Sequence, residues 1–262
     1  MKRNSHWKYP PLTARLYGVW FRHMRVYTRN LISNGLPPFL EPLIFLGGIG
    51  LGLGAYVREM DGVPYIQYLA IGLLMTAPMF TAAFECSFGT FIRLEFDKVY
   101  DGMLAAPMSI SDLLIGEMLW AGTKGFFFTC TVLAVVGCFG LVAFPQILLA
   151  PFVGFLTGFM FATLSLLITS FVKSINHFNF YFTGLLSPMF FFAGVVFPLE
   201  DLPPVVRPVA EILPLTHSVR LTRLLASWEW EWWVVIDLGY IALFAAVFGY
   251  LAIVRLRKRL VL

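Results

Sequence analysis

The sequence has little charge. Only 13% of its 262 residues are Asp, Glu, Lys or Arg, whereas 59% are hydrophobic and the mean hydropathy is +0.79. A soluble globular domain carries about 25% charged residues. A chain of this length makes one or two globular domains, and their cores could not hide so many apolar side chains from water. The composition therefore excludes a water-soluble protein and predicts a polytopic membrane protein.

Metal ligands and disulfide partners are also scarce. The three cysteines, Cys86, Cys130 and Cys138, lie in apolar stretches, and their odd number argues against a disulfide framework. The four histidines lack the spacing of a metal site. We therefore expect neither a metal nor a cofactor in this chain.

Motifs for nucleotide binding and nucleophilic catalysis are missing. The glycine-rich run at 47–54 is not followed by Gly-Lys-Ser/Thr, so it is no phosphate-binding loop. Small residues in an apolar segment instead favour close helix packing. No Gly-x-Ser-x-Gly motif frames a serine that could act with His177. Nothing in the sequence stacks bases or tracks phosphates, so nucleic acid is not an expected partner.

Long apolar runs dominate what remains. A membrane-spanning helix needs about 20 predominantly apolar residues, and continuous rather than alternating runs indicate helices instead of a β-barrel. The sequence predicts an all-α protein with an N-terminal cytoplasmic segment, 1–35, and a six-helix transmembrane domain, 36–262. The six expected spans are 36–56, 64–92, 111–138, 146–171, 176–197 and 232–254.

The positive charges predict the orientation of these spans. With six spans, both termini and the second and fourth loops share one side of the membrane. Fourteen of the 19 Lys and Arg residues fall on that side, four fall on the other, and Lys124 lies within a span. Because positive residues concentrate in cytoplasmic loops, we expect both termini in the cytoplasm.

The N-terminal segment Thr13–Ser33 is amphipathic. Arg15, Arg22 and Arg29 recur at every seventh residue, opposite apolar side chains at steps of three and four. This pattern is typical of a helix in the cytoplasmic membrane interface, and prolines at 37 and 38 would end it. The alternative is a solvated helix packed on a soluble partner. The apolar set comprises Leu16, Trp20, Met24, Tyr27 and Leu31.

The second cytoplasmic loop, Arg93–Asp112, carries an unusual concentration of charge. It favours a short helix with charged and apolar faces, punctuated by Gly102 and Pro107, and Ser109 with Asp112 resembles a capping box that opens the third span. Such a stiff element could convert an external push into tilting of the two spans that it joins. The alternative is an ordinary solvated loop helix. The candidate contact residues are Arg93, Glu95, Phe96, Asp97, Lys98, Tyr100 and Asp101.

The fifth loop, 199–231, is rich in proline yet remains apolar. It has room for two short helices before the last span, which suggests a re-entrant hairpin dipping into the outer leaflet. The alternative is a pair of helices lying flat on the outer surface. Four of the seven tryptophans follow, and such a cluster is typical of the outer membrane interface. They are Trp228, Trp230, Trp232 and Trp233.

Five ionisable residues lie within or near the expected spans. Each costs on the order of 3 kcal/mol at mid-membrane unless it is paired, hydrated or near an interface. Glu117 and Lys124 share a helical face but lie about 10 Å apart along the axis, so each needs a partner from another helix. We expect structural pairing between helices, with a proton relay as the alternative. The set comprises Glu41, Glu85, Glu117, Lys124 and Asp237.

Four motifs along the chain are distinctive. They are Phe84-Glu-Cys-Ser-Phe-Gly-Thr, Tyr100-Asp-Gly-Met-Leu-Ala-Ala-Pro-Met-Ser, Gly116-Glu-Met-Leu-Trp-Ala-Gly-Thr-Lys and Leu213-Pro-Leu-Thr-His. These motifs resemble the type-2 ABC exporter permease family, and most closely its nodulation-factor (lipochito-oligosaccharide) exporter subgroup. The resemblance covers essentially the whole chain, and its motifs do not identify the cargo.

The resemblance implies a six-span permease of the bacterial inner membrane that forms a homodimer and binds two copies of a separate ABC ATPase subunit. That subunit would bind ATP and Mg. The helix between spans two and three would dock into it, which matches Arg93–Asp101 within a coupling segment at 93–110. The cargo would be amphiphilic, such as a glycolipid, a polysaccharide or a hydrophobic drug.

The resemblance also places the translocation path at the dimer centre, lined by spans one, two and five. Aromatic residues are abundant in span five and can stack on sugars or contact acyl chains, although most of the 27 phenylalanines suit packing or lipid contact. Tyr181 stands out because its hydroxyl needs a partner in lipid. The candidate path residues are Glu41, Glu85, Phe178, Tyr181, Phe182 and Pro188.

The sequence thus favours an exporter permease without an enzymatic centre of its own. The alternative is a self-contained membrane enzyme acting on lipid-linked substrates. A scaffold or assembly factor without transport activity is a third hypothesis. ATP-dependent cargo movement would separate the first from the other two.

Overall fold

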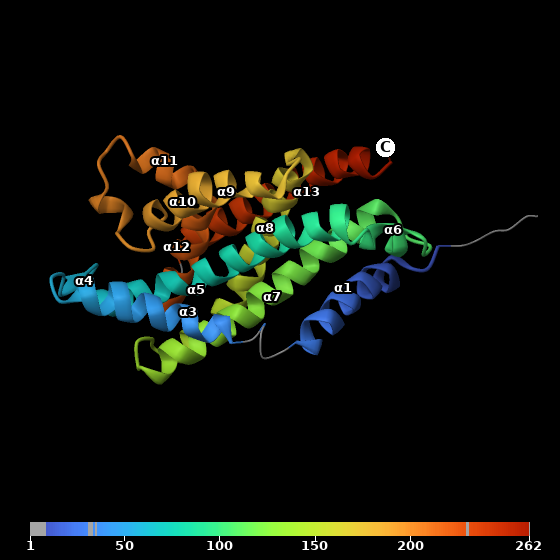
Figure 1. Ribbon diagram of the computed structural model, residues 1–262. Helices are drawn as coiled ribbons and strands as arrows, with labels where there is room; N and C mark the ends of the chain where they lie inside the picture. The colour runs from blue at the N-terminus through green and yellow to red at the C-terminus, as the bar shows by residue number, and fades with distance from the viewer. Residues whose placement is uncertain (1–8, 31–33, 35, 229–230, 262) are drawn as a thin grey trace, which may run out of the picture.

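The protein is an elongated bundle of helices in the computed structural model (Figure 1), which describes residues 9–30, 34, 36–228 and 231–261. The only strands in those ranges are two short ones, β1 (Glu59–Met60) and β2 (Val63–Pro64), which pair antiparallel as a small hairpin. The all-α class expected from the sequence is confirmed.

Four helices in the described part are long and apolar enough to cross a membrane. The first begins as α5 (Tyr65–Phe84) and continues with π-helical turns to Phe96. The others are α7 (Ile110–Cys138), α8 (Ala150–Phe171, preceded by a 3-10 turn from Gln146) and α13 (Trp233–Val261). They match the expected spans 64–92, 111–138, 146–171 and 232–254 to within a few residues, except that the first and last run further at their C-terminal ends.

The expected spans 36–56 and 176–197 form shorter and less regular helices. The first comprises α3 (Pro37–Phe45), a π-helical stretch to Leu51 and α4 (Gly52–Gly54). The second comprises a 3-10 turn at Ile175–His177, α9 (Phe178–Tyr181), a π-helical stretch and α10 (Ser187–Phe192). Proline removes a backbone donor and interrupts regular helix. The structure therefore supports four spans by length and composition, and a count of six remains a hypothesis.

A seam of glycines joins α7 and α8 at the centre of the bundle. A Cβ atom at Gly125 would lie 2.5 Å from the carbonyl oxygen of Gly154, and one at Gly158 would lie 2.9 Å from that of Ala121. Small residues allow helices in a membrane to approach this closely. By contrast, Gly47, Gly48 and Gly52 in the first apolar segment meet nothing within 4 Å.

The N-terminal helix α1 (Leu12–Arg29) packs along α7. Val19 is fully buried and a Cβ at Gly116 would clash with it, while Trp20 Nε1 donates to Thr123 Oγ1 over 2.9 Å. Of the apolar stripe expected from the sequence, Trp20 and Tyr27 contact Trp120 of α7, and Leu31 lies outside the described residues. Tyr17 and Val26 remain exposed on the other side.

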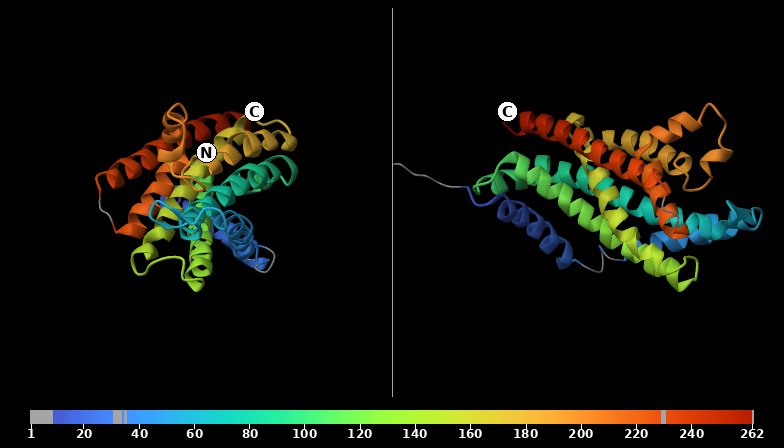
Figure 2. Two further views of the ribbon diagram at one scale, coloured as in Figure 1. Left: turned by 90° about the vertical axis from the view of Figure 1, so that its left-hand side faces the viewer. Right: turned by 180° about the vertical axis from the view of Figure 1, so that it is seen from behind.

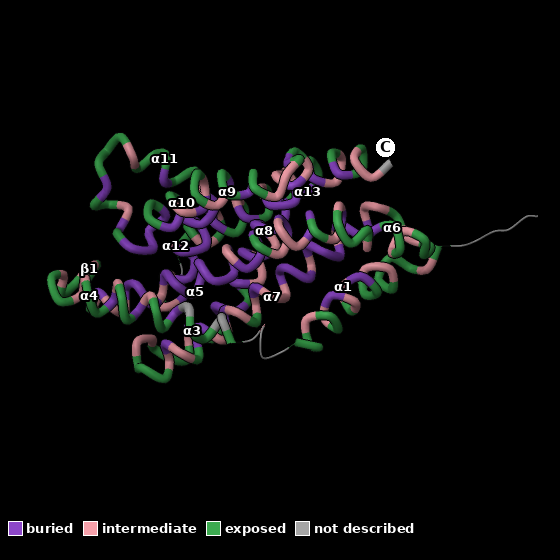
Figure 3. The backbone as a smooth tube through the Cα atoms, viewed as in Figure 1, coloured by how far each residue is buried: buried purple, intermediate pink, exposed green. Residues whose placement is uncertain are grey.

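The two ends of the bundle differ in character (Figures 1 and 2). One end carries the C-terminus and α6 (Val99–Leu104). The opposite end carries the β1–β2 hairpin, α11 (Arg207–Ile212) and the start of α12 (Pro214–Ser227). Buried residues concentrate on α5, α8 and α12, as Figure 3 shows.

Candidate functional site

The segment 93–110 lies at the end of the bundle that also carries the C-terminus. The long helix that starts at Tyr65 ends at Phe96, Lys98 adopts a left-handed conformation with φ 50°, and α6 follows. The segment is therefore a helix end, a sharp turn and a second short helix, where the sequence had suggested one helix over Arg93–Asp101. The left-handed turn at Lys98 makes the break.

The candidate contact residues divide into two groups. Phe96, Asp97, Lys98 and Asp101 are exposed at this end of the molecule. Tyr100 is only 1% exposed, and the side chain of Arg93 turns into the bundle. Phe96 is 63% exposed, an unusual position for a large apolar side chain beside charged neighbours. The segment thus offers a mixed apolar and charged surface above a buried polar base.

The turn is tied to both ends of the chain. Arg259 on α13 donates to Glu95 over 2.7 Å and also to the carbonyl oxygens of Thr169 and Val172. Arg15 on α1 forms an ion pair with Asp112. These contacts connect α1, α8 and α13 to the two long helices that the turn joins.

The start of α7 is capped as the sequence predicts. Ser109 is the N-cap residue, and its hydroxyl accepts from the backbone N–H of Asp112 over 3.2 Å. The carboxylate of Asp112 accepts from the backbone N–H of Ser109 over 2.7 Å. The capping box is confirmed, and it fixes the angle at which the chain enters α7.

Beneath the turn, four charged side chains form what we call the inner cluster: Glu85, Arg93, Glu117 and Lys124. Arg93 contacts Glu85 over 2.8 Å and Glu117 over 3.1 Å. Lys124 donates to the other oxygen of Glu85 over 2.9 Å. Two acids and two bases leave no net formal charge, which is how ionised side chains are tolerated away from water.

Two further elements contact the inner cluster. His23 on α1 places Nε2 3.3 Å from Glu117, and its ring stacks on Trp120. Thr90 donates to Glu117 over 2.9 Å. Burial, together with the negative charge of Glu117, raises the pKa of Tyr100 well above its usual value. The Tyr100 side chain, which anchors α6 in the bundle, is therefore uncharged.

The candidate path residues are scattered over several environments. Phe178 and Tyr181 are buried, and the Tyr181 hydroxyl lies 2.8 Å from the Ser165 hydroxyl. The ring centroid of Phe182 lies 4.3 Å from that of Phe84, an exposed residue of α5, and the two rings are tilted. Pro188 is exposed. Glu41 falls on α3, but its side chain is outside the described part of the structure.

At the opposite end, four side chains form what we call the outer cluster: Glu211, His217, Arg220 and Asp237. Asp237 on α13 is fully buried and accepts from Arg220 over 2.6 Å, and its Oδ1 lies 2.8 Å from His217 Nδ1. Arg220 also donates to Glu211 over 2.8 Å. The outer cluster therefore fastens α11 and α12 to the last long helix.

Sequence reasoning found some members of these clusters and missed others. Glu85, Glu117, Lys124 and Asp237 stood out because they are charged within apolar segments. His23 lies on an amphipathic helix, where polar residues are ordinary, so nothing marked it as a partner of the inner cluster. A charge in an apolar run can be recognised locally, whereas its partner depends on how the helices pack.

Comparison with known proteins identifies the family of this chain. The sequence profile of the family described as ABC-2 type transporter matches residues 15–227. The chain is similar to Nodulation protein J of Sinorhizobium fredii, 32% identical over 242 residues that cover 92% of each chain, and to Nodulation protein J of Rhizobium meliloti, 33% identical with the same coverage. It is also similar to the Inner membrane transport permease YadH of Escherichia coli, 22% identical over 174 residues that cover 66% of this chain and 68% of YadH. The chain belongs to the ABC-2 type transporter family.

Proposed function

We propose that this protein is the membrane-spanning subunit of a bacterial ABC exporter, has no enzymatic centre of its own, and moves an amphiphilic cargo outward with ATP hydrolysed by a separate subunit. Membership of the ABC-2 type transporter family supports the subunit role. Similar proteins are named Nodulation protein J. The cargo class that we propose comprises glycolipids, polysaccharides and hydrophobic drugs. The observation that carries the coupling role is the exposed surface formed by Phe96, Asp97, Lys98 and Asp101 above the inner cluster.

The contacts of this surface explain how a push could be transmitted. Phe96, Asp97 and Asp101 are available to a partner, while Arg93 and Tyr100 anchor the same segment in the bundle. Arg93 contacts acids on the two long helices that flank the turn. A displacement of the turn would therefore move α5 and α7 together. We propose that two ATPase subunits press on this surface in each catalytic cycle.

We further propose six spans with both termini in the cytoplasm. The C-terminal end of α13 and the turn at Phe96–Asp101 lie at one end of the bundle, and α11 lies at the other. The proposed topology requires this separation. The helix α12 is buried between α5, α8 and α13 for most of its length. That burial favours a re-entrant hairpin over helices lying flat on the outer surface.

A homodimer with the cargo path at its centre completes the proposal. The first apolar helix leaves one face uncovered, because Gly47 and Gly48 meet nothing within 4 Å and Ile44 is 71% exposed. Glycines on an apolar helix suit close contact with a second helix. Phe180 on α9 is 78% exposed, so the fifth span also has an aromatic surface free for a second copy or for cargo.

The test uses a triple variant, Phe96→Ala with Asp97→Ala and Asp101→Ala, and the control Glu59→Ala at the opposite end. Tagged protein is isolated from its own membranes, and co-purifying ATPase is identified by mass spectrometry. We expect the triple variant to insert normally, to lose the ATPase and to lose ATP-dependent cargo transport in vesicles, while the control keeps both. Normal ATPase recovery and transport by the triple variant would refute the coupling role, and turnover of a lipid-linked substrate by the isolated chain would favour an enzyme.

A further inference from the structure

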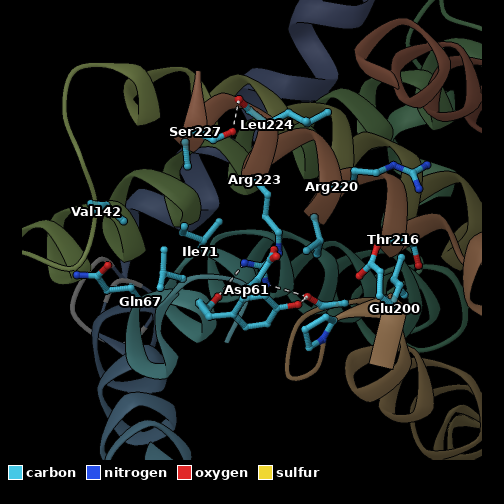
Figure 4. A pocket seen from close by; sticks show the side chains of 18 of the residues that line it. Asp61, Gln67, Ile71, Val142, Glu200, Thr216, Arg220, Arg223, Leu224 and Ser227 are labelled. Carbon is cyan, nitrogen blue, oxygen red and sulfur yellow. Dashed lines mark hydrogen bonds between the residues drawn. The ribbon is translucent and has the colours of Figure 1, made fainter. Parts of the chain in front are cut away.

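A pocket of ≈ 520 Å³ opens at the hairpin end of the bundle, between the start of α5, the loop after α10 and the end of α12 (Figure 4). It lies away from both the proposed ATPase surface and the inner cluster. Its lining combines arginine, two carboxylates and the ring of Tyr68. Three observations on this pocket indicate what it binds.

Arg223 lines the pocket, and only some of its N–H groups donate to the described residues. Its Nη1 donates to the carbonyl oxygen of Tyr68 over 3.1 Å, its Nη2 donates to that of Gly194 over 2.8 Å, and its guanidinium lies 3.5 Å from the centroid of the Tyr68 ring. A guanidinium has five N–H groups, so three have no acceptor among the residues that the structure describes. Within the described ranges no carboxylate lies within ion-pair distance of it. Arg220, which also lines the pocket, differs because Asp237 and Glu211 match its charge.

Two carboxylates line the same pocket. Asp61 and Glu200 are exposed, and neither joins an ion pair with any residue that the structure describes. An isolated anion bound at Arg223 would be repelled by these acids, and an isolated cation would be repelled by Arg223. A ligand that carries both signs complements all three groups, since opposite charges facing one another determine specificity.

The pocket lies at the level where lipid headgroups are expected. Leu224 and Ser227 line it, and the chain then passes directly to Trp228, which is 53% exposed. Trp232 and Trp233 at the start of α13 are 68% and 36% exposed. Exposed indoles gather at the boundary between hydrocarbon and water. The pocket mouth therefore stands beside the headgroup layer of one leaflet.

From these observations we infer that the pocket binds the headgroup of a phosphoethanolamine lipid. The phosphate accepts hydrogen bonds from the free N–H groups of Arg223, and the ammonium lies between Asp61 and Glu200. A choline headgroup fits less well because it has no N–H to donate, and a glycerol headgroup lacks the positive charge. In the orientation proposed above, this leaflet is the outer one. Binding of the headgroup does not depend on transport.

The experiment measures which lipid the full-length protein retains. Delipidated protein in detergent is incubated with equal amounts of phosphatidylethanolamine, phosphatidylcholine and phosphatidylglycerol with identical acyl chains, and bound lipid is counted by native mass spectrometry. The variants are Arg223→Gln and the double variant Asp61→Asn with Glu200→Gln. Arg58→Gln, an exposed arginine at the same end that does not line this pocket, is the matched control.

We expect the wild type and the control to prefer phosphatidylethanolamine, and Arg223→Gln to bind it at least about tenfold more weakly, because a charged hydrogen bond contributes about 1.5–3 kcal/mol. The double variant should turn the preference toward phosphatidylglycerol. The Asp61 and Glu200 side chains are exposed and form no ion pair with the described residues, so the double variant decides the matter if Arg223→Gln does not fold. Equal retention of the three lipids by the wild type, or an unchanged preference in the double variant, overturns the inference. Protection from thermal unfolding by glycerophosphoethanolamine but not by inorganic phosphate supports recognition of the whole headgroup, and equal protection by both overturns it.

Discussion

Removal of Arg93 tests whether the inner cluster holds the turn to the bundle. This guanidinium is the shared partner of Glu85 and Glu117. In Arg93→Met, Lys124 still compensates Glu85 at 2.9 Å, whereas Glu117 loses its arginine and keeps the hydroxyl of Thr90 and the 3.3 Å contact with His23. Glu117 is 1% exposed, so water cannot replace the lost cation. Breaking a buried pair from one side costs about 3–5 kcal/mol, and we expect a loss of this size.

The double variant Arg93→Met with Glu117→Gln supplies the internal control. It removes one base and one acid together, so the remaining pair of Glu85 and Lys124 is neutral. We expect it to recover at least half of the lost free energy of unfolding, because the penalty in the single variant arises mainly from an uncompensated carboxylate. The change in the double variant minus the sum of the changes in the single variants Arg93→Met and Glu117→Gln measures the coupling of the two side chains.

The assay is equilibrium unfolding in mild detergent, followed by circular dichroism as SDS is added, with all four members of the cycle measured in the same buffer. A loss below about 1 kcal/mol in Arg93→Met would show that the cluster is solvated and contributes little. Strict additivity of the two changes would show that Arg93 and Glu117 do not interact. Either result would refute the argument that the buried charges fix the turn.

Three further predictions follow from contacts elsewhere in the bundle. Gly125→Ala places a methyl group 2.5 Å from a backbone carbonyl oxygen of α8 and should destabilise the protein by about 1–3 kcal/mol. The control Gly239→Ala meets nothing within 4 Å and should leave stability unchanged, and thermal melting in detergent compares the two variants. Arg259→Gln removes the ion pair to the turn and should lower ATP-dependent transport in vesicles several-fold without loss of the ATPase subunit, while the exposed Arg257→Gln should leave transport unchanged. Asp237→Asn removes the buried negative charge that Arg220 faces in the outer cluster and should cost about 3 kcal/mol; a melting temperature equal to that of the wild type would contradict this.

The accuracy of the sequence predictions varied with the kind of feature. The long helices at 111–138 and 146–171 were predicted almost to the residue, because hydropathy accumulates over about 20 positions and each residue contributes independently of its partners. The cap at Ser109 was also predicted, since it involves residues three positions apart. The irregular helix around Phe182 was not, because π-helical turns have no comparable local pattern.

The sequence predicted the position of the candidate coupling segment more accurately than its conformation. Its charge between two apolar runs marked the place, and Phe96, Asp97 and Asp101 are exposed there. Arg93 was included among the contact residues, but its side chain contacts Glu85 and Glu117 instead. The rotation of a helix end cannot be read from composition, so the side that a terminal arginine faces stayed undetermined until the neighbouring helices were in place.

Composition and hydropathy were enough to predict an all-α membrane protein, the positions of its longest helices and the charges that need partners. Those properties depend on transfer from water to lipid and on short-range backbone capping, which each stretch of sequence carries alone. The packing of the helices was needed to show that Arg93 bridges two acids, that Arg220 is matched by Asp237 while Arg223 has no carboxylate partner among the described residues, and that α12 is buried among α5, α8 and α13. These pairings depend on the rotation and crossing of helices far apart in the sequence, and close packing fixes that geometry for the whole bundle at once.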